Sequence, residues 1–313
     1  MRKWTGADIP DQSGRTVLIT GANSGLGLRS AEALASAGAH VLLGCRNQEK
    51  GARALAEVRA VASDAEPELL ALDLADLGSV RAAAERVNGS VAGLDVLMNN
   101  AGVMAIPEAR TADGFEMQFG TNHLGHFALT GLLLPALLRA PAPRVVTTSS
   151  AVHKIGRMHW NDLQWERRYS RWPAYAQSKL ANLLFTAELN RWSRAEAPRL
   201  KAVAAHPGYA ATNLQGVGPQ LAGNRVMGGV MDALNSVVAQ SDVMGAWPQL
   251  YAATMDDVES GEYFGPRSLF ETRGYPTRVR PSRAARNQVA ARRLWEISEQ
   301  LTGVRFATLV RPS

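Results

Sequence analysis

The segment Thr20-Gly21-Ala22-Asn23-Ser24-Gly25-Leu26-Gly27 decides the fold of this 313-residue chain. It follows the apolar run Val17-Leu18-Ile19 and precedes an alanine-rich amphipathic stretch, so it is expected to connect a buried strand to a helix. Its three glycines permit a tight turn and a close approach of the backbone to a ligand. A pyrophosphate held there would face the N-terminus of the helix. The segment therefore predicts a dinucleotide site.

Runs rich in β-branched and leucine residues recur along the chain and alternate with helix-like segments. Such alternation predicts parallel strands joined by right-handed crossovers, which is an α/β fold with a doubly wound parallel sheet and helices on both faces. The two longest helices are expected at 113–139 and 173–194, and a last helix at 282–301. The expected strands are 17–20, 40–44, 69–73, 96–99, 144–149, 200–206 and 262–264.

The whole chain, 1–313, is expected to form one domain, because no Pro/Ser-rich linker and no repeat of fixed period interrupts it. Its cofactor half should span 14–150, and its catalytic and substrate half 151–313. Residues 213–241 are rich in Gly, Met and Val and almost free of charge. They predict either a lid over the site or a helix packed on the core, with Val226, Val230 and Leu234 facing inward.

Composition excludes several other classes of protein. One cysteine, Cys45, cannot form an internal disulfide, so a cytoplasmic protein is expected. Residues 1–14 contain no secretory apolar segment, and the longest apolar run, 127–138, is too short for a membrane anchor and is interrupted by Pro135. The net charge of +6 comes largely from arginine, with a dense tract at 267–293. No nucleic-acid-binding motif accompanies the tract, and surface arginines on a terminal helix are the favoured explanation.

Tyr175 and Lys179 stand four residues apart in a helix-like segment, so both side chains lie on one face of the helix. Transfer of a hydride to a carbonyl leaves an alkoxide that must be protonated, and a phenol can supply the proton. A free phenol has a pKa of about 10, and lowering it to ~7 requires about 4 kcal/mol. A lysine cation ~4 Å away, at an effective dielectric constant of ~20, provides about that much. The pair therefore predicts a proton donor whose pKa the lysine lowers.

The order of these motifs resembles the short-chain dehydrogenase/reductase family over nearly the whole chain. Besides the glycine turn and the Tyr175/Lys179 pair, the shared motifs are Asp73-Leu74, Asn99-Asn100-Ala101-Gly102, Asn122, Ser149-Ser150 and Pro207-Gly208. Within the family, the chain is most similar to the retinol dehydrogenase and protochlorophyllide reductase branch. This narrower resemblance is carried by Gly44-Cys45-Arg46-Asn47, His153, Tyr169-Ser170, 175–182, Ala205-His206-Pro207-Gly208 and Tyr263-Phe264.

The resemblance implies a single-domain Rossmann fold and a role for each matching residue. The implied catalytic set is Asn122, Ser150, Tyr175 and Lys179. In that set Ser150 would bind the substrate oxygen, and Asn122 would hold a water linked to the lysine, which itself binds the nicotinamide ribose. Relatives pair through the two long helices, which implies a homodimer or homotetramer. The implied cofactor-binding set is Gly21, Asn23, Ser24, Gly25, Leu26, Gly27, Arg46, Asp73, Leu74, Asn100, Ala101, Gly102, Tyr175, Lys179, Pro207, Gly208 and Thr212.

Three of these residues also have simpler explanations. Asp73, which would contact the adenine, could instead cap the next helix. Asn122 could be an ordinary amide inside a helix. Arg46 stands nineteen positions after Gly27, where a chain selective for NAD usually has an acidic residue. A guanidinium there can bind a 2′-phosphate, so NADP(H) is predicted over NAD(H), although Arg46 could also be a solvated arginine at the end of a strand.

An insertion separates Ser150 from Tyr175, which are 25 residues apart, further than in compact relatives. A pocket wall or a surface flap is expected there. No compact His-x-x-x-His pattern appears in the insertion, and no metal is predicted. Its aromatic and potential ligand residues are His153, His159, Trp160, Asp162, Trp165, Glu166, Tyr169 and Trp172.

The function that follows is an NADP(H)-dependent oxidoreductase that interconverts a hydrophobic aldehyde or ketone and its alcohol. The expected partner is a small hydrophobic substrate rather than nucleic acid or a membrane. One alternative is a reductase of a carbon–carbon double bond in a bulky planar substrate. Another is a catalytically silent NADP-binding regulator, which the presence of all four implied catalytic residues disfavours.

Overall fold

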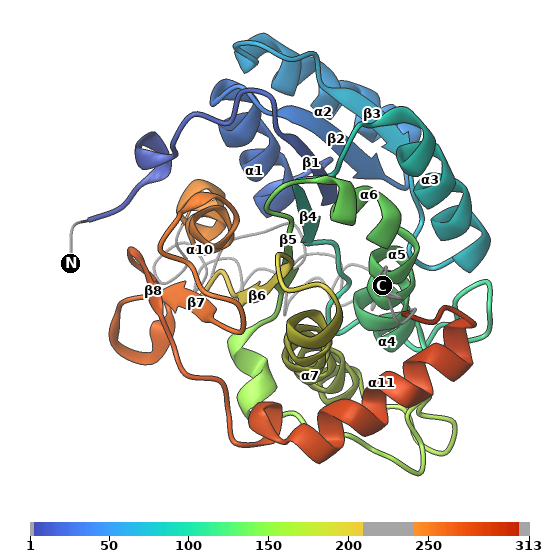
Figure 1. Cartoon of the computed structure of the whole chain (residues 1–313). Coiled ribbons are helices and arrows are strands. Elements are labelled where there is room, and N and C mark those ends of the chain that lie inside the picture. Colours follow the sequence, from blue (N-terminus) through green and yellow to red (C-terminus); the bar gives the residue numbers. More distant parts are fainter. Residues whose placement is uncertain (1–2, 209–240, 307–313) are drawn as a thin grey trace, which may run out of the picture.

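The computed structural model describes residues 3–208 and 241–306, and within them the strands form a single sheet (Figure 1). The strands are β1 (Thr16–Thr20), β2 (His40–Cys45), β3 (Glu68–Ala71), β4 (Val96–Asn99), β5 (Arg144–Thr148), β6 (Lys201–Ala205), β7 (Tyr263–Pro266) and β8 (Pro276–Arg278). Their order in the sheet is β3-β2-β1-β4-β5-β6-β7-β8. Neighbouring strands from β3 to β7 are parallel, and β8 is antiparallel to β7.

Helices cover both faces of this sheet. Val17 and Ile19 of β1 lie in one buried cluster and Leu18 in another, because successive side chains of a strand point to opposite faces. The first cluster includes side chains of α1 (Gly25–Ser36), α2 (Gln48–Val61) and α10 (Asp242–Thr254), and the second those of α3 (Leu77–Ser90), α5 (Gly125–Leu132) and α7 (Arg171–Glu196). The predicted doubly wound α/β fold is confirmed. The other helices in the described part of the chain are η1 (Gly6–Asp8), α4 (Met117–Phe119), η2 (Gly120–Leu124), α6 (Leu134–Arg139), η3 (Ala151–Lys154), η4 (Leu269–Glu271), η5 (Ala284–Arg286) and α11 (Gln288–Thr302).

The continuous helix predicted at 113–139 is broken into pieces, so that prediction is wrong in detail. Glu116 caps α4, and its carboxylate accepts hydrogen bonds from the amides of Gln118 and Phe119. A π-helical turn, Gly120–Leu124, separates α4 from α5. α6 starts afresh after α5, because Pro135 has no amide hydrogen to donate to the preceding turn. π-helical turns often mark functional sites, so the turn between α4 and α5 is of interest for the site.

The C-terminal region contains two elements that the sequence reading missed, α10 and β8. α10 contains Pro248 in its interior, which argues against a helix when only the sequence is read. The arginine tract 267–293 does not lie on one terminal helix as expected. Arg278 is on β8 and only the last two arginines, Arg292 and Arg293, are on α11.

α11 crosses α7 beside α5 (Figure 1). The ring of Trp295 stacks on Phe185 of α7 with centroids 5.9 Å apart, and its edge contacts Phe127 of α5 at 5.1 Å. Phe306 adds a further ring at 4.3 Å from Trp295. Pairing through α5 and α7, as the sequence led us to expect, would therefore need a face that α11 leaves free. The homodimer or homotetramer stays a prediction.

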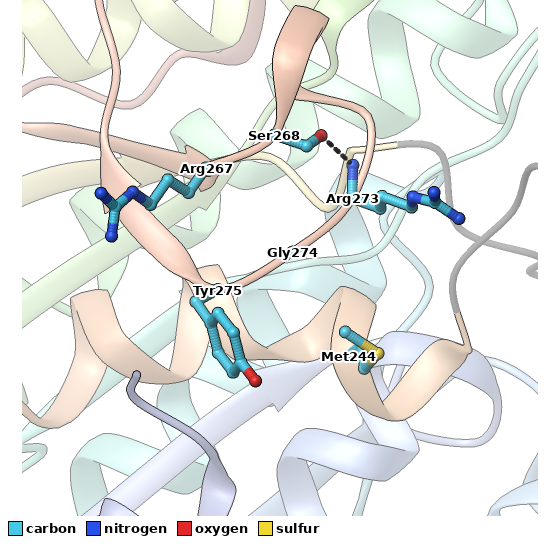
Figure 2. A pocket seen from close by; sticks show the side chains of 6 residues that line it. All are labelled: Met244, Arg267, Ser268, Arg273, Gly274 and Tyr275. Carbon is cyan, nitrogen blue, oxygen red and sulfur yellow. Dashed lines mark hydrogen bonds between the residues drawn. The ribbon is translucent and has the colours of Figure 1, made fainter. Parts of the chain in front are cut away.

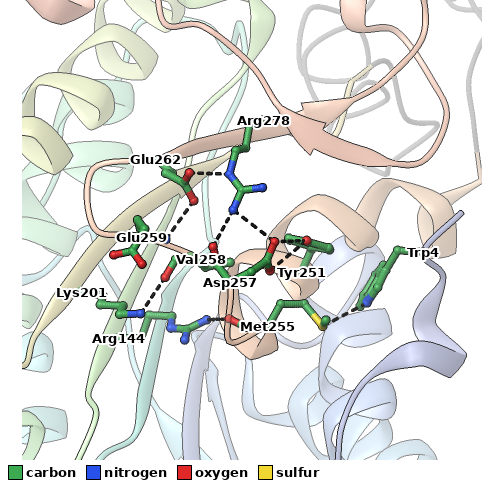
Figure 3. Close-up of polar contacts among 10 residues, drawn as sticks. All are labelled: Trp4, Arg144, Lys201, Tyr251, Met255, Asp257, Val258, Glu259, Glu262 and Arg278. Carbon is green, nitrogen blue, oxygen red and sulfur yellow. Dashed lines mark hydrogen bonds and ion pairs between the residues drawn. The ribbon is translucent and has the colours of Figure 1, made fainter. Parts of the chain in front are cut away.

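A polar network fixes the edge of the sheet opposite the glycine turn (Figure 3). Arg144, the first residue of β5, donates to the carbonyl groups of Ala252 (2.8 Å) and Met255 (3.1 Å) at the end of α10. Lys201, the first residue of β6, donates to the Val258 carbonyl at 2.7 Å. Arg144 thus satisfies carbonyl groups that the end of α10 leaves unpaired, and Lys201 satisfies one in the loop that follows. The network therefore stabilises α10 against β5 and β6.

The single cysteine, Cys45, is buried at the end of β2. Burial raises the pKa of its thiol to about 12, so the thiol stays protonated and unreactive near neutral pH. Among residues 3–208 and 241–306, no helix has both the length and the apolar character needed to cross a bilayer.

The burial of α11 gives a prediction about stability. Leu294 is 1% exposed and lies in a core cluster with Leu180 and Leu184 of α7, so Leu294→Ala should lower the free energy of unfolding by about 2–5 kcal/mol. Val289 on the same helix is 79% exposed, and Val289→Ala should change it by less than about 0.5 kcal/mol. Urea denaturation followed by circular dichroism measures both. Equal effects of the two changes would contradict the packing of α11.

Candidate active site

The glycine turn leaves the end of β1 as predicted. Gly21 has a positive φ of 68°, and its amide donates to the Gly44 carbonyl of β2 at 2.8 Å. A Cβ atom at Gly27 would lie 2.4 Å from the Gly21 carbonyl oxygen, so position 27 tolerates only glycine while the turn keeps this shape. Ser24 is the N-cap residue of α1, and its side chain makes no capping hydrogen bond. The first turn of α1 thus begins at the loop, where its amides suit an anion.

The end of β4 is joined to this turn through Thr20. The amides of Asn100 and Ala101 donate to the Thr20 hydroxyl oxygen at 3.0 and 2.9 Å, and the Asn100 side chain donates to the Thr20 carbonyl at 2.8 Å. A Cβ atom at Gly21 would lie 3.0 Å from Ala101. The two motifs that predicted a cofactor site, far apart in the sequence, are therefore in direct contact.

The ends of β2 and β3 continue the same edge of the sheet. Arg46 follows β2 directly and is exposed. Asp73 follows β3, and its carboxylate accepts a hydrogen bond from the Ala75 amide at 2.9 Å. The N-cap of α3 is Asp76, so the alternative explanation of Asp73 as the helix cap is wrong. Leu74, beside Asp73, is buried.

Ser150, Tyr175 and Lys179 meet at the carboxyl end of β5. The Ser150 hydroxyl lies close enough to the Tyr175 phenol to favour its ionised form. Lys179 donates from Nζ to the Thr148 carbonyl at 3.1 Å. The neighbouring Ser149 points the other way and donates to the backbone carbonyl of Lys179 at 2.8 Å. As alternation along the strand suggested, Ser150 rather than Ser149 faces the tyrosine.

In the protein without cofactor or substrate, burial determines the protonation of Tyr175 and Lys179. It raises the pKa of Tyr175 to about 12, against the effect of the nearby Ser150 hydroxyl, and lowers that of Lys179 to about 8. The expected lowering of the Tyr175 pKa to ~7 by the lysine is therefore not found. The Lys179 Nζ atom lies 5.8 Å from the centre of the tyrosine ring, and withdrawal from water disfavours the charged form of each group.

Asn122 lies in the π-helical turn and is fixed by three contacts of its side chain. It donates to the Val103 carbonyl and the Ser178 hydroxyl, both at 2.9 Å, and accepts from the Val103 amide at 2.7 Å. A Cβ atom at Gly102 would lie 3.0 Å from the Asn122 amide oxygen and 3.4 Å from Lys179 Nζ. Asn122 therefore bridges the β4 loop and α7 beside the lysine, which an ordinary helix-interior amide would not do.

His126 is a residue of the site that the sequence reading missed. Its Nδ1 lies 3.0 Å from the Asn122 carbonyl oxygen and its Nε2 lies 2.8 Å from the Thr20 hydroxyl. Because a carbonyl only accepts, Nδ1 carries the proton and Nε2 accepts from Thr20. Burial lowers the His126 pKa to about 4, which keeps the ring neutral. The available signal was its position four residues after Asn122, on the same face of the helix.

The insertion before Tyr175 packs mainly on the helices rather than on the cofactor edge. Gln177 of α7 accepts from the His159 amide and donates to the Leu163 carbonyl, each at 2.9 Å. Tyr169 donates to the Ile106 carbonyl at 2.9 Å. Trp172 is half exposed, and its ring lies 6.2 Å from that of Tyr175. The insertion is thus largely a flap on the surface, with Trp172 next to the tyrosine.

Figure 2 shows an open pocket of about 390 Å³ between α10 and the loop that joins β7 to β8. The guanidinium groups of Arg267 and Arg273 point in opposite directions, and the Arg273 amide donates to the Ser268 hydroxyl at 3.0 Å. None of the predicted catalytic residues lines it. Its lining residues are Met244, Arg267, Ser268, Arg273, Gly274 and Tyr275.

Part of the predicted site lies outside the described residues, namely Thr212 and the predicted lid up to residue 240. Pro207 and Gly208 are described and follow β6, with Gly208 at a positive φ of 69°. Within 3–208 and 241–306, the His, Cys, Asp and Glu side chains form no group of three or more that could hold a metal ion.

Comparison with known proteins identifies the family. The family model described as short chain dehydrogenase matches residues 15–219. Retinol dehydrogenase 12 of Mus musculus is 40% identical over 304 residues, which cover 96% of this chain and 90% of that protein. Retinol dehydrogenase 14 of Homo sapiens is also 40% identical, over 96% of this chain and 89% of that protein.

Solved structures agree with this assignment. A crystal structure of an uncharacterized protein from Mycobacterium paratuberculosis is 46% identical, covers 98% of this chain and 100% of that chain, and has a TM-score of 0.80. A short chain dehydrogenase from Shigella flexneri shares the fold, with a TM-score of 0.63 at 23% identity, over 82% of this chain and 98% of that one. The chain belongs to the short chain dehydrogenase family, in its retinol dehydrogenase branch, and is an oxidoreductase that acts on CH–OH and C=O groups.

Proposed function

We propose that this chain interconverts a hydrophobic aldehyde or ketone and its alcohol, with NADP(H) as the hydride carrier. The observation that carries the proposal is the meeting of two groups of residues at one edge of the sheet. The Ser150 hydroxyl lies close enough to the Tyr175 phenol there to affect its pKa, and Lys179 Nζ lies beside Gly102 of the loop that contacts the glycine turn. A group that can donate a proton thus lies next to a loop whose shape suits the binding of a dinucleotide.

A dinucleotide fits the residues present. Gly27 approaches Gly21 so closely that no Cβ atom could be placed there. Without a side chain at this position, the backbone at the start of α1 is accessible to a pyrophosphate. Arg46 is exposed at the end of the neighbouring strand and would bind a 2′-phosphate. The Shigella flexneri protein of the same fold was solved in complex with NADP. These observations support NADP(H) as the cofactor.

In the proposed reaction the nicotinamide, when bound, supplies the hydride to the carbonyl carbon or accepts it from the alcohol. As the carbon–oxygen double bond opens, its electron pair moves to the oxygen, and Tyr175 donates the phenolic proton to that atom. Ser150 donates a hydrogen bond to the same oxygen and stabilises its growing charge. Lys179 stabilises the phenolate that Tyr175 becomes. In the oxidative direction each of these steps is reversed.

The substrate class is proposed from the relatives and from the aromatic surroundings of the tyrosine. The relatives that cover most of the chain are named for retinol, a long apolar alcohol. Trp172 is half exposed beside Tyr175, and an exposed indole ring favours contact with apolar ligands. We therefore expect bulky apolar aldehydes and alcohols to be better substrates than short ones.

Tyr175→Phe removes only the phenolic oxygen, so the protein should fold and bind cofactor while turnover falls by ~10²–10⁴. Tyr251→Phe is the matched control, because Tyr251 hydrogen-bonds to Asp257 at the far edge of the sheet and should leave turnover unchanged. NADPH oxidation with all-trans-retinal or a long-chain aldehyde measures both variants. Appreciable activity in a folded, cofactor-bound Tyr175→Phe protein would overturn the assignment.

Lys179→Met should slow turnover, weaken cofactor binding and shift the pH dependence of alcohol oxidation to higher pH. The sign follows because the cation favours phenolate, so its loss raises the Tyr175 pKa and the basic form is reached only at higher pH. Since both residues serve one proton transfer, Tyr175→Phe/Lys179→Met should be scarcely slower than Tyr175→Phe alone. A pH profile of Lys179→Met identical to that of the wild type would refute this role.

Arg46→Ala should weaken NADPH binding about tenfold to a hundredfold, as expected for a charge-assisted contact of ~1.5–3 kcal/mol, and leave NADH binding nearly unchanged. Arg53→Ala removes the same charge from the exposed surface of α2 and should affect neither cofactor. Fluorescence titration of each cofactor measures both variants. Equal losses for NADPH and NADH would show that Arg46 does not recognise the 2′-phosphate.

A series of straight-chain aldehydes tests the apolar substrate class. Each added methylene that becomes buried should lower the free energy of binding by about 0.8 kcal/mol until the pocket is full, so KM should fall with length and then level off. Steady-state kinetics with NADPH held saturating gives this series. KM values independent of chain length would argue against an apolar pocket.

A further inference from the structure

One carboxylate, that of Glu271, joins two loops that leave the site edge of the sheet. Its Oε1 atom lies 3.0 Å from Lys154 Nζ, and its Oε2 atom lies 3.0 Å from His206 Nε2. Lys154 ends η3, the turn that begins directly after Ser150, and His206 is the residue that follows β6. Glu271 itself belongs to η4, in the loop between β7 and β8. Three segments distant in sequence thus meet at one side chain.

The contact of Glu271 with His206 is a close approach of two buried polar atoms. The Gly208 amide donates to His206 Nδ1 at 3.2 Å, so the proton of the neutral ring is on Nε2. His206 Nε2 lies 3.0 Å from Glu271 Oε2 without forming a hydrogen bond to it, and neither atom has a hydrogen-bond partner among the described residues. The His206 side chain is fully buried, which makes its single acidic neighbour important. The imidazole therefore connects the Gly208 turn to the carboxylate.

The same loop also contacts Gly208 through its backbone. Gly208 has a positive φ of 69°, and a Cβ atom there would lie 2.4 Å from the Thr272 carbonyl oxygen. Phe270 and Glu271 themselves adopt left-handed φ angles of 61° and 56°. Such angles cost free energy for residues other than glycine and persist only where the surroundings enforce them. The loop is thus held in a strained shape against the Gly208 turn.

Buried aromatic rings next to the Glu271 carboxylate complete the connection to Ser150. His153 Nδ1 donates to the Ser150 carbonyl at 2.7 Å, and the ring of Tyr263 lies between the rings of His153 (5.6 Å) and His206 (5.2 Å). The partners of Glu271 keep its pKa low, at about 2, so the carboxylate is charged at neutral pH. Ser150 and the Gly208 turn are therefore fixed relative to one another from one side.

We propose that Glu271 is a positioning residue, whose carboxylate holds the loop after Ser150 and the His206–Gly208 turn in the mutual arrangement that hydride and proton transfer require. The inference rests on the role proposed above for Ser150 and on the cofactor contact that the family resemblance implies for Gly208. Glu271 touches neither the reacting atoms nor the glycine turn. Its effect should therefore be confined to the nicotinamide end of the cofactor and to the chemical step, where a misplacement of about 1 Å can cost ~10²-fold in rate.

The first test measures cofactor binding and needs no substrate. Glu271→Ala should weaken the binding of NADPH several-fold. It should weaken the binding of 2′,5′-ADP, which lacks the nicotinamide half, by less than about twofold, because distant, independent parts of a site contribute separately to binding. NADH and ADP are titrated in parallel, so that the result does not depend on which cofactor the protein prefers. Glu259→Gln, on an exposed carboxylate at the far edge, is the control and should change neither.

The second test measures turnover of all-trans-retinal and the primary isotope effect with deuterated cofactor. Glu271→Ala should lower kcat about tenfold to a hundredfold and increase the isotope effect, since chemistry becomes slower than release. Glu271→Gln, which keeps the size and shape of the side chain but has no charge for Lys154, should be intermediate. Lys154→Met/Glu271→Gln should be no worse than Glu271→Gln alone, because both changes remove one interaction.

The outcomes separate this proposal from the proposed function. If the wild type turns over none of the aldehydes, the proposed function fails, while the binding comparison still decides the role of Glu271. Glu271→Ala with a lower melting temperature but unchanged kcat, isotope effect and NADPH to 2′,5′-ADP ratio would show that the carboxylate only stabilises the fold. Equal weakening of NADPH and 2′,5′-ADP would likewise overturn the proposal, because the effect would then reach the whole cofactor site.

Discussion

The Thr20 hydroxyl is the contact on which the arrangement of the site depends. It accepts the amides of Asn100 and Ala101 and faces His126 Nε2 at 2.8 Å. Through these bonds the glycine turn after β1, the loop after β4 and the helical segment that carries Asn122 become one unit. A buried hydroxyl with all its hydrogen-bonding capacity used is rigid, because breaking any one bond leaves a polar atom unpaired away from water. This edge of the sheet, where we propose that the cofactor binds, is thus rigid.

Much of this arrangement could be predicted from the sequence, because parallel strands end at the same edge of a sheet. The expected strands 17–20 and 96–99 differ from β1 and β4 by at most one residue, and their ends carry the motifs that meet. Ser150, Tyr175 and Lys179 also come together as expected. Properties that depend on burial could not be predicted from the sequence. The pKa of Tyr175 was expected to fall, and burial raises it to about 12 in the protein alone.

Other failures have the same origin in contacts between distant residues. Nothing local marks Glu271 as a partner of His206, since the pair is 65 residues apart and is brought together by the loop after β7. The helix predicted at 113–139 is periodic enough to look regular, yet it contains a π-helical turn at Asn122, whose side chain accepts a hydrogen bond from the Val103 amide. Pro248 argued against a helix at 242–254, yet α10 forms there and packs on α1 and the sheet. Tertiary packing overrides local preference in each case.

The two pKa shifts in the site are best understood together. Burial makes the phenolate of Tyr175 and the ammonium of Lys179 each unfavourable alone, and among the described residues no carboxylate forms an ion pair with Lys179. At a pKa of about 8 the lysine is nevertheless still mostly protonated at pH 7. A lone buried cation gains most when an anion appears beside it, because the attraction acts at a low local dielectric constant. The unpaired charge of Lys179 therefore costs stability in the resting protein. In the reaction proposed above, this charge would be compensated when Tyr175 gives up its proton. The same burial that opposes each charge separately would then favour the ion pair.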